Sequence, residues 1–189
     1  TVYVNDTLGN LNFSTRSFTV DTVAPSLNIT FPSQNNTNTT NNQIDVNFTF
    51  SDSGVGIDSC WYSNDTFSVA NYSLGSGGTC VNITNITWSE GTHNVRIYLN
   101  DTLNNLNTST RTFVIDNTGP DVNITNPGQN NTNSSDNTLD VLYTRSDALT
   151  LVESCWYGND TYSINLSLGS AGVCANITNV TWSYGLHNI

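Results

Sequence analysis

The stretch Gly91–Pro120 reads GTHNVRIYLNDTLNNLNTSTRTFVIDNTGP. Apolar and polar residues alternate over His93–Asn100, which is the period of a half-buried β-strand. Asp101–Asn105 has the composition of a turn, because Asp and Asn side chains bond their own backbone and tolerate positive φ. Thr110–Ile115 predicts a second strand, and Pro120 ends the pattern because proline has no N–H to donate to a ladder. The stretch therefore predicts a β-hairpin.

The same sequence pattern recurs along the chain. Val2–Asn12 matches Ile97–Asn107 at an offset of 95 residues, and Asn82–Ser89 recurs as Asn176–Ser183 at an offset of 94. A period of this length corresponds to one small domain and not to a solenoid turn. We expect residues 1–21 to be the final hairpin of a preceding module. Residues 22–116 are then a complete module, and residues 117–189 a module without its last hairpin.

The two ends of the sequence continue one another. His187–Ile189 matches His93–Val95, and Thr1–Asp6 follows in register without gap or overlap. Either the chain is a window on a longer tandem array, or the missing hairpin is donated by a neighbouring subunit, as in β-strand addition. A donated element should begin in a loop and not inside a strand, so we favour the tandem array.

Alternation predicts seven short strands and no helix in the complete module. Seven strands separated by turn signals indicate an antiparallel β-sandwich, so the fold class is all-β. The expected strands are Ser26–Phe31, Ile44–Phe50, Ile57–Tyr62, Val69–Leu74, Cys80–Trp88, His93–Asn100 and Thr110–Ile115.

Composition excludes several classes of partner. The net charge is −11 and only 10 % of the residues are charged, with no Lys among them. A nucleic-acid binder needs clustered cations, and this chain would repel phosphate, as it would an anionic membrane surface. No apolar run approaches the roughly 20 residues that span a bilayer.

Three groups of residues mark the modules: Asp21–Pro25 at a module start, Glu90–Val95 with Asp101 and Asn105 at a module end, and Cys60–Ser63 with Cys80. On these residues the chain resembles tandem immunoglobulin-like repeat modules of archaeal and bacterial cell-surface glycoproteins. This resemblance implies immunoglobulin-like β-sandwich modules of about 95 residues. It says little about biochemical activity, because this architecture hosts many functions.

Four cysteines permit three pairings, and the repeat favours the pairing within each module. A disulfide closing a loop of this size contributes on the order of 3 kcal/mol. A zinc site using His93 and His187 is the alternative, but the chain has no Cys-x-x-Cys motif. A nucleophilic cysteine would need a neighbouring base, and none is evident. Disulfides indicate an oxidising, extracytoplasmic location. The predicted disulfide residues are Cys60, Cys80, Cys155 and Cys174.

The chain holds 19 Asn-x-Ser/Thr sequons. This is more than twice the roughly 8 that the Asn, Ser and Thr content alone would produce. We predict that most carry N-glycans; the alternative is a neutral polar surface without sugar. The predicted sites are Asn5, Asn12, Asn28, Asn35, Asn38, Asn47, Asn64, Asn71, Asn82, Asn85, Asn100, Asn107, Asn123, Asn130, Asn133, Asn159, Asn165, Asn176 and Asn179.

Carboxylates gather at turns and junctions. We expect them to cap turns; Ca²⁺ at the module junctions is the less favoured alternative, because several oxygens would have to converge on it. The only two Glu residues do not recur in register, which argues against a paired-carboxylate hydrolase. The residues concerned are Asp6 and Asp101 in hairpin turns, Asp21, Asp116 and Asp121 at junctions, and Glu90 and Glu153.

Together these patterns predict a structural repeat of an extracellular, heavily N-glycosylated filament, stalk or surface-layer protein. Its partners would be copies of itself in a fibre or tandem array, and we expect no catalytic residue, no metal and no cofactor besides covalent glycans. An adhesin or receptor-type binding module is the alternative, as is an accessory repeat of a larger secreted protein. The loops Ser33–Asn42 and Pro127–Asn137 lack the Trp, Tyr and Arg anchors of a binding hot spot, which favours the structural interpretation.

Overall fold

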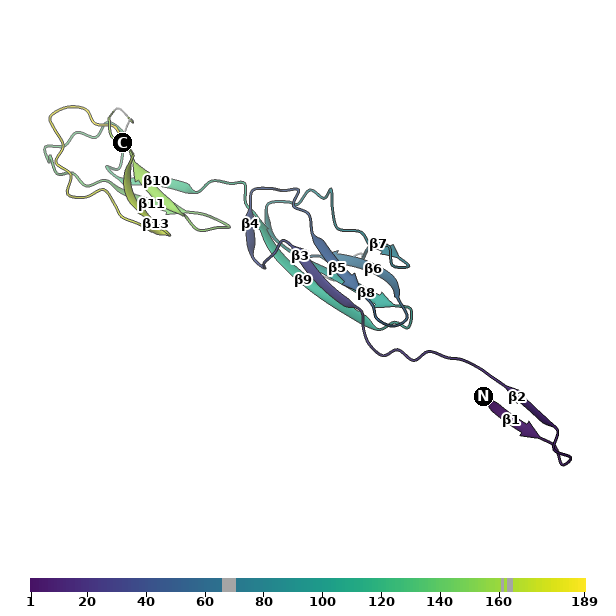
Figure 1. The fold of residues 1–189 in the computed structure, drawn as a ribbon. Coiled ribbons are helices and arrows are strands. Elements are labelled where there is room, and N and C mark those ends of the chain that lie inside the picture. Colours follow the sequence, from purple (N-terminus) through teal and green to yellow (C-terminus); the bar gives the residue numbers. More distant parts are fainter. Residues whose placement is uncertain (66–70, 161, 163–164) are drawn as a thin grey trace. The chain divides into compact units, whose positions relative to one another are not determined.

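The computed structural model describes residues 1–65, 71–160, 162 and 165–189 (Figure 1). Over these residues the chain forms strands and no helix, which confirms the all-β prediction. In the described part of the chain, accordingly, no helix is long and apolar enough to span a bilayer. The strands are β1 (Val2–Asn5), β2 (Leu11–Ser14), β3 (Ser26–Phe31), β4 (Thr37–Thr39), β5 (Asn47–Ser51), β6 (Ile57–Asn64), β7 (Tyr72–Ser76), β8 (Gly91–Asp101), β9 (Leu106–Ile115), β10 (Asp121–Asn126), β11 (Leu142–Ser146), β12 (Ser154–Tyr157), β13 (Leu166–Ser170) and β14 (Val173–Cys174).

The chain divides into two compact units. The first contains the N-terminal hairpin and most of residues 22–116, and the second contains residues 117–189. In full, the first unit is Thr1–Thr37, Asn41–Trp88 and His93–Phe113, and the second is Asn38–Thr40, Ser89–Thr92 and Val114–Ile189.

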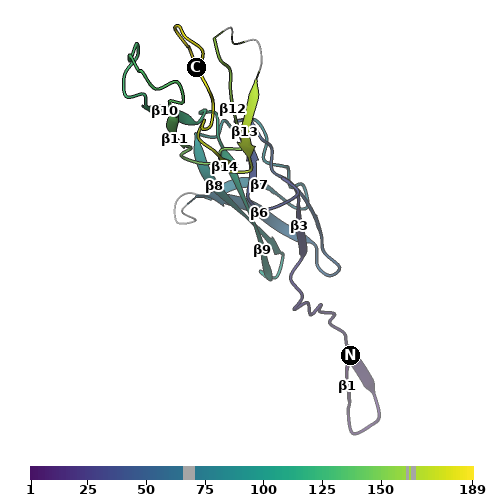
Figure 2. The same ribbon diagram turned by 90° about the vertical axis from the view of Figure 1, so that its left-hand side faces the viewer.

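Residues 22–116 form a β-sandwich of the immunoglobulin-like class. One sheet pairs β3 with β5 antiparallel, with Leu27 opposite Phe50. The other has the strand order β4-β9-β8-β6-β7, and Figure 2 shows β6, β8 and β9 beside one another. Strand β6 pairs antiparallel with both β7 and β8. The two sheets supply most of the buried residues of this module, and the segments between strands add Ile44, Val46, Ile83 and Trp88.

Strand β8 is the centre of that core, as the alternation of its sequence predicts. His93, Val95, Ile97 and Leu99 are buried, whereas the residues between them are half-buried. Side chains of a strand point alternately to the two faces of the sheet, so one face of β8 is apolar and the other polar. The strand is two residues longer at its start, and one at its end, than the predicted His93–Asn100.

Trp88 closes the core beside β9. Its indole Nε1 donates a hydrogen bond of 2.8 Å to the Ile44 carbonyl oxygen. Its ring meets Phe113 edge to face, with 5.0 Å between the ring centroids. Val46 and Ile83 form an isolated antiparallel bridge next to it. A buried indole N–H needs a hydrogen-bond acceptor, so the contacts of Trp88 with Ile44 and Phe113 fix the segment around Trp88 between the two sheets.

The second unit repeats these contacts. Strands β10 and β11 pair antiparallel, and β12, β13 and β14 form a three-stranded sheet. Val141 and Ile177 form the equivalent isolated bridge, and Trp182 Nε1 donates to the Leu139 carbonyl oxygen over 2.8 Å. The repeated sequence therefore produces repeated hydrogen bonds, and not only repeated strands.

Some predicted strands differ from the observed ones. The segment predicted as a strand over Cys80–Trp88 forms only the isolated bridge at Ile83, and Val81 is exposed. Its backbone hydrogen bonds go to separate partners, because Val81 donates to the Leu74 carbonyl oxygen and Trp88 to that of Asn42, so no continuous ladder forms. The strand predicted over Val69–Leu74 begins at Tyr72, and residues 69 and 70 lie outside the described residues. The short strand β4 has no alternating pattern and was not predicted.

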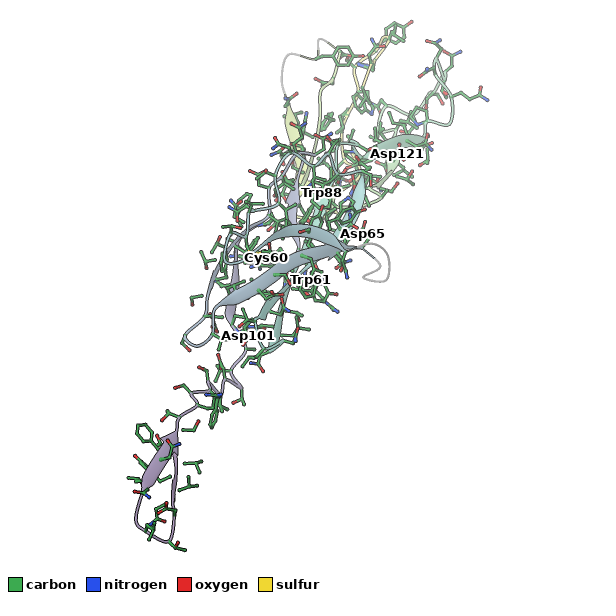
Figure 3. The ribbon with its side chains drawn as sticks, turned by 90° about the vertical axis from the view of Figure 1, so that its right-hand side faces the viewer. Cys60, Trp61, Asp65, Trp88, Asp101 and Asp121 are labelled. Atoms are coloured by element: carbon green, nitrogen blue, oxygen red, sulfur yellow. A yellow bond between two sulfur atoms is a disulfide. The ribbon has the colours of Figure 1, made fainter. Side chains whose placement is uncertain are left out.

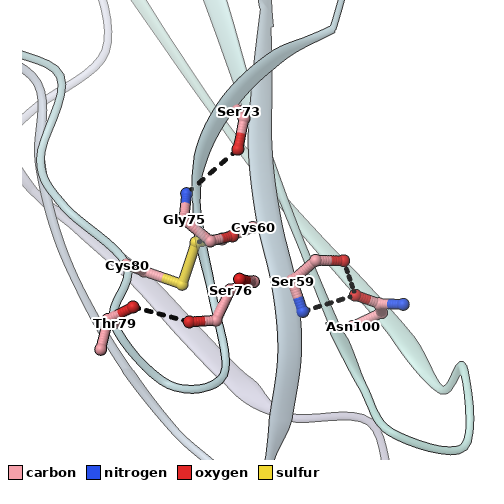
Figure 4. Close-up of a disulfide and its surroundings, with 8 residues drawn as sticks. All are labelled: Ser59, Cys60, Ser73, Gly75, Ser76, Thr79, Cys80 and Asn100. Atoms are coloured by element: carbon pink, nitrogen blue, oxygen red, sulfur yellow. Dashed lines mark hydrogen bonds between the residues drawn. A yellow bond between two sulfur atoms is a disulfide. The ribbon is translucent and has the colours of Figure 1, made fainter.

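The two disulfides join the cysteines that the repeat predicts. Cys60 is bonded to Cys80, with a Cα–Cα distance of 6.0 Å (Figure 4). Cys155 is bonded to Cys174, with a Cα–Cα distance of 5.7 Å. The strand opposite Cys60 contains a bulge, where Gly75 has φ +133°. A Cβ at Gly75 would collide with the Thr79 carbonyl oxygen, so only glycine fits there.

Residues 1–21 contain a hairpin of their own. Strand β1 pairs antiparallel with β2, with Tyr3 opposite Phe13. The turn between them contains Gly9 at φ +84°, and the same position of the next repeat is Asn104 at φ 65°. Glycine and asparagine are the residues that tolerate this left-handed conformation, which explains why the two repeats differ there without changing the turn.

Candidate functional site

The sequon asparagines lie mostly on the surface. Of the 19, 14 are exposed, four are half-buried and one is buried. The exposed ones are Asn5, Asn12, Asn28, Asn35, Asn38, Asn71, Asn82, Asn85, Asn123, Asn130, Asn133, Asn165, Asn176 and Asn179; the half-buried ones are Asn47, Asn64, Asn107 and Asn159. A glycan is bulky and solubilising and needs a surface position, so this distribution suits modification at most of the predicted sites.

Two repeated sequon side chains also form hydrogen bonds within the fold. Asn82 accepts a 3.0 Å hydrogen bond from the Phe48 backbone N–H through its carboxamide oxygen. Its counterpart Asn176 accepts a 3.2 Å hydrogen bond from the Tyr143 backbone N–H in the same way. An N-glycan is attached to the other atom, the amide nitrogen Nδ2, so these hydrogen bonds are compatible with a sugar at both sites.

Asn100 is the buried exception. Its side-chain oxygen accepts hydrogen bonds from the Ser59 N–H at 3.1 Å and the Ser59 hydroxyl at 2.6 Å (Figure 4). Its Nδ2 faces the Asn104 side-chain oxygen at 3.4 Å. The residue is only 9 % exposed, so the folded module has no room for a glycan there. Alternation alone places Asn100 on the outer face, and sequence reasoning misses the side chains that cover it.

Three carboxylates converge at one end of the first module. Asp21, Asp52 and Asp101 each offer an oxygen within 4.8 Å of the other two. The sequence pointed to Asp21 and Asp101, but not to Asp52. The signal that could have found it is the repeat, because Asp52 recurs as Asp147 at the 95-residue offset.

Each of these carboxylates caps a turn. Asp101, which is fully buried and is labelled in Figure 3, accepts the backbone N–H groups of Leu103 at 2.9 Å and Asn105 at 2.8 Å. Burial raises the pKa of the Asp101 carboxyl, but the hydrogen bonds from Asn105 and Leu103 outweigh it and hold the pKa below its usual value. Asp21 Oδ2 accepts the Val55 N–H at 3.0 Å.

Asp52 differs from its two neighbours. Its Oδ2 accepts the N–H groups of Gly54 at 3.1 Å and Gly56 at 2.7 Å. Its Oδ1 is buried and has no hydrogen-bond partner. Asp21, Asp52 and Asp101 are therefore the described residues that could hold a cation in this module, although Ca²⁺ normally takes 6–8 oxygen ligands.

The other junction carboxylates lie elsewhere. Asp116 accepts a 2.7 Å hydrogen bond from the Thr150 hydroxyl. Asp116 and Asp121 line a small pocket of about 120 Å³ in the second unit, together with Glu90 and Asp147. The predicted junction residues therefore do not form one set: Asp21 belongs to the cluster of the first module, whereas Asp116 and Asp121 face this pocket.

The histidines pack in the manner that the sequence favoured. His93 Nδ1 lies 3.2 Å from an Asp65 carboxylate oxygen, and its ring stacks obliquely against Trp88. His187 Nδ1 lies 3.2 Å from Asp160, and its Nε2 faces the Ser183 carbonyl oxygen at 2.8 Å. Both cysteine pairs are disulfides in this structure, so neither offers a thiolate to the zinc site that the sequence left as an alternative.

Both members of the second pair have perturbed acidities. The Ser183 carbonyl oxygen, followed by Asp160, raises the pKa of His187 above its ordinary value of 6.5. The Asn188 backbone N–H, followed by His187, lowers the pKa of Asp160 below its ordinary value of 3.8. A charged imidazole beside a carboxylate is therefore the favoured state between these two pKa values.

The second unit also presents an open apolar face. A cavity of about 450 Å³ is lined by Val122, Ile124, Val141, Tyr143, Trp156 and Ile177, among others. Their counterparts at Val46 and Ile83 in the first module are buried. In the first module the core that contains these counterparts also includes Ile97 of β8 and Phe113 of β9.

Comparison with known proteins yields a distant structural likeness and no family. No profile of a known protein family matches it, and no curated protein matches it. Solved fibronectin(III)-like modules of Clostridium thermocellum CbhA are similar at 17 % identity and a TM-score of 0.39, over 82 % of this chain and 80 % of that chain. The strand pairings described above, and not this distant likeness, define the chain as all-β with immunoglobulin-like sandwich modules.

Proposed function

We infer that the chain is a structural repeat of an extracellular, heavily N-glycosylated filament, stalk or surface-layer protein. The observation that carries this proposal is the agreement between the density of sequons and their exposure on modules whose core contacts repeat. Sugar on these positions would coat the modules, hinder proteases and keep sheet edges from pairing with other chains. The resemblance of the junction sequences to immunoglobulin-like repeats of archaeal and bacterial cell-surface glycoproteins supports the same role.

The extracellular location is supported by the disulfides. Each module contains one, and disulfides persist in oxidising compartments outside the cytoplasm. The partners that this role requires are copies of the same module in a fibre or tandem array. A net charge of −11 argues against nucleic acid as a partner. We assign the chain a non-enzymatic role.

A binding module is the second candidate. The observation in its favour is the pair Trp61 and Tyr98, whose rings stack on the outer side of β6 and β8 with 5.4 Å between their centroids. Aromatic side chains of this kind are enriched in binding hot spots. The loops at 33–42 and 127–137 contain none, so a contact surface would lie on the sheet and not on the loops.

Two measurements on native material test the structural role. Mass spectrometry before and after deglycosylation should reveal a large loss of mass, with glycopeptides that map to the exposed sequons. Electron microscopy should reveal long uniform fibres with an axial step of one or two modules. Bare asparagines would overturn the glycoprotein assignment, and short monomeric stalks on a larger head would favour the binding module.

A further inference from the structure

We propose that the outer face of the five-stranded sheet in the first module binds N-glycans of a second copy of this chain. The proposal rests on the proposed function, because it takes both the glycans and the neighbouring copies from it. It adds a contact that glycosylation alone does not require, so the two can fail separately.

Two aromatic rings form the centre of this outer face. Trp61 of β6 lies directly opposite Tyr98 of β8 in the antiparallel ladder. Their rings are parallel to within 3°, with 5.4 Å between the centroids. Both residues are half-buried, so part of the pair remains accessible to solvent. The face of an aromatic ring is partially negative and attracts the polarised C–H groups of a sugar ring.

The surroundings of the pair are polar and nearly uncharged. Between Ser59 and Ser63 of β6, and between Asn94 and Asn100 of β8, the outward residues include no carboxylate, and Arg96 is their one charged side chain. The whole chain has a net charge of −11, so two copies repel one another electrostatically. A hydroxyl-rich sugar therefore suits this face better than the acidic protein surface of another copy.

The hydrogen bonds of this face use groups that also bind sugar hydroxyls. Arg96 Nε donates to the Thr110 hydroxyl oxygen over 3.3 Å, and the Thr112 hydroxyl donates to the Asn94 side-chain oxygen over 2.9 Å. These contacts place threonines of β9 on the same side of the sheet as Arg96 and Tyr98. The aromatic pair is thus flanked by hydroxyl, amide and guanidinium groups.

The outward positions between the same limits carry no accessible sequon. The one sequon among them is Asn100, which is 9 % exposed and has no room for a glycan. By contrast, 14 of the 19 sequon asparagines of the chain are exposed. A sugar coat would therefore not be attached at the positions beside Trp61 and Tyr98 on these two strands.

The other sheet of the same module displays sequons on its outer face. Asn28 of β3 is exposed and lies opposite Thr49 of β5. Asn47 of β5 points to the same side, because Val46 and Phe48 on either side of it are buried. The module therefore has a predicted sugar-bearing face on one side and the aromatic pair on the other. A contact between two different faces can repeat from copy to copy.

Binding of sugar by the aromatic pair is the first test. Glycopeptides released from the glycosylated chain by proteolysis are the probe, and the immobilised 189-residue chain without glycans is the receptor. Trp61→Leu removes the ring but keeps an apolar side chain. Tyr72→Leu is the matched control, because Tyr72 is also partly exposed but stacks on Tyr62, with 5.0 Å between the ring centroids. Thermal unfolding reports whether each variant is folded.

We expect the parent chain and Tyr72→Leu to retain the glycopeptides, and Trp61→Leu to lose this retention. The same peptides after removal of the sugar should not be retained by any of the three. Bare asparagines would overturn the glycoprotein assignment and this proposal together. Glycopeptides that the parent does not retain, or that Trp61→Leu retains equally, would overturn this proposal alone.

A second test identifies the neighbouring copy as the source of the sugar, and it leaves the aromatic pair unchanged. A triple variant of the glycosylated chain removes the sequons on the outer faces of β3, β5 and β10, and Thr87→Ala removes the sequon of Asn85 as a control. The three substitutions are Thr30→Ala, Thr49→Ala and Thr125→Ala.

Sedimentation velocity should detect association of the glycosylated parent and of Thr87→Ala as concentration rises, and loss of this association in the triple variant. A glycosylated parent that stays monomeric, or a triple variant that associates like the parent, overturns the proposal. Retention of glycopeptides would in that case assign the aromatic pair to sugars from another source.

Discussion

Residues 22–116 and residues 117–189 carry the same repeat, but among the described residues only the first of these regions contains the final hairpin of the module, β8–β9. The bridges Val46–Ile83 and Val141–Ile177 are buried in both. Ile29, however, is 3 % exposed, and its counterpart Ile124 is 44 % exposed. The core around the two bridges is therefore buried in both modules, whereas the core around Ile29 is buried only where the hairpin β8–β9 covers it.

The largest expected contrast is in glycan occupancy. Asn28 and Asn123 are exposed counterparts on β3 and β10, so glycopeptide mass spectrometry should find both modified. Asn100 should be unmodified, because Ser59 and Asn104 cover its carboxamide. A modified Asn100 would contradict its burial, and different occupancy at Asn28 and Asn123 would contradict the equivalence of the two modules.

The second prediction concerns the buried aromatic ring of the hairpin. Phe113→Ala should lower the free energy of unfolding by about 3–5 kcal/mol, because it removes a fully buried ring. Phe18→Ala, at the equivalent exposed position, should change it by less than about 0.5 kcal/mol at concentrations where the chain is monomeric. Denaturant titration measures both, and equal effects would contradict the comparison.

The third prediction compares the disulfides. Replacing Cys60 and Cys80 by serine should destabilise the first module by about 2–4 kcal/mol. The pair Cys155 and Cys174 closes a loop of nearly the same length, 19 residues against 20, so its replacement should destabilise the second module by a similar amount. Unfolding of each double variant in denaturant checks this. A negligible effect in one module alone would show that the two rely on their disulfides differently.

The smallest expected effect is a pH dependence of the second unit. The raised pKa of His187 stabilises the fold fully below pH 6.5, and this stabilisation is lost as the pH rises through the pKa of the folded state. The lowered pKa of Asp160 stabilises it above pH 3.8, and that stabilisation is lost as the pH falls through its own folded-state pKa. Stability should therefore be highest between these values.

His187→Gln tests this pH dependence. The variant should lose the decline in stability on the alkaline side of that window, measured by thermal unfolding at a series of pH values. Asp160→Asn should remove both this decline and the loss of stability on the acidic side of the window. A parent chain whose second unit has a flat profile from pH 4 to pH 8 would contradict the assignment of this pair.

The regular alternation of β8 made most of the fold predictable. Val95, Ile97 and Leu99 are buried where the period of two places them. The disulfide pairing was also predictable, because two copies of one repeat must satisfy the same constraint. These features depend on local sequence and on repetition, and both can be read without coordinates.

Other features depend on residues distant in sequence. Asn100 stands on the outward side by alternation, yet Ser59 of the neighbouring strand covers it. Asp52 joins Asp21 and Asp101 only because three turns meet at one end of the sandwich. The stacking of Trp61 on Tyr98 likewise requires the register of β6 against β8. No local pattern reports such contacts.

The Cys60–Cys80 bond has a mechanical consequence. If the first module were unfolded by pulling on its ends, the segment between Cys60 and Cys80, which are separated by 20 residues, could not extend. At roughly 3.3–3.6 Å for each extended residue, these 20 residues would span about 66–72 Å. The bonded cysteines remain 6.0 Å apart between their Cα atoms, so the disulfide withholds about 60–66 Å of extension. When pulled, a module with its disulfide intact would therefore extend less than a module in which the disulfide is reduced. A chain of many oxidised modules would likewise be less extensible.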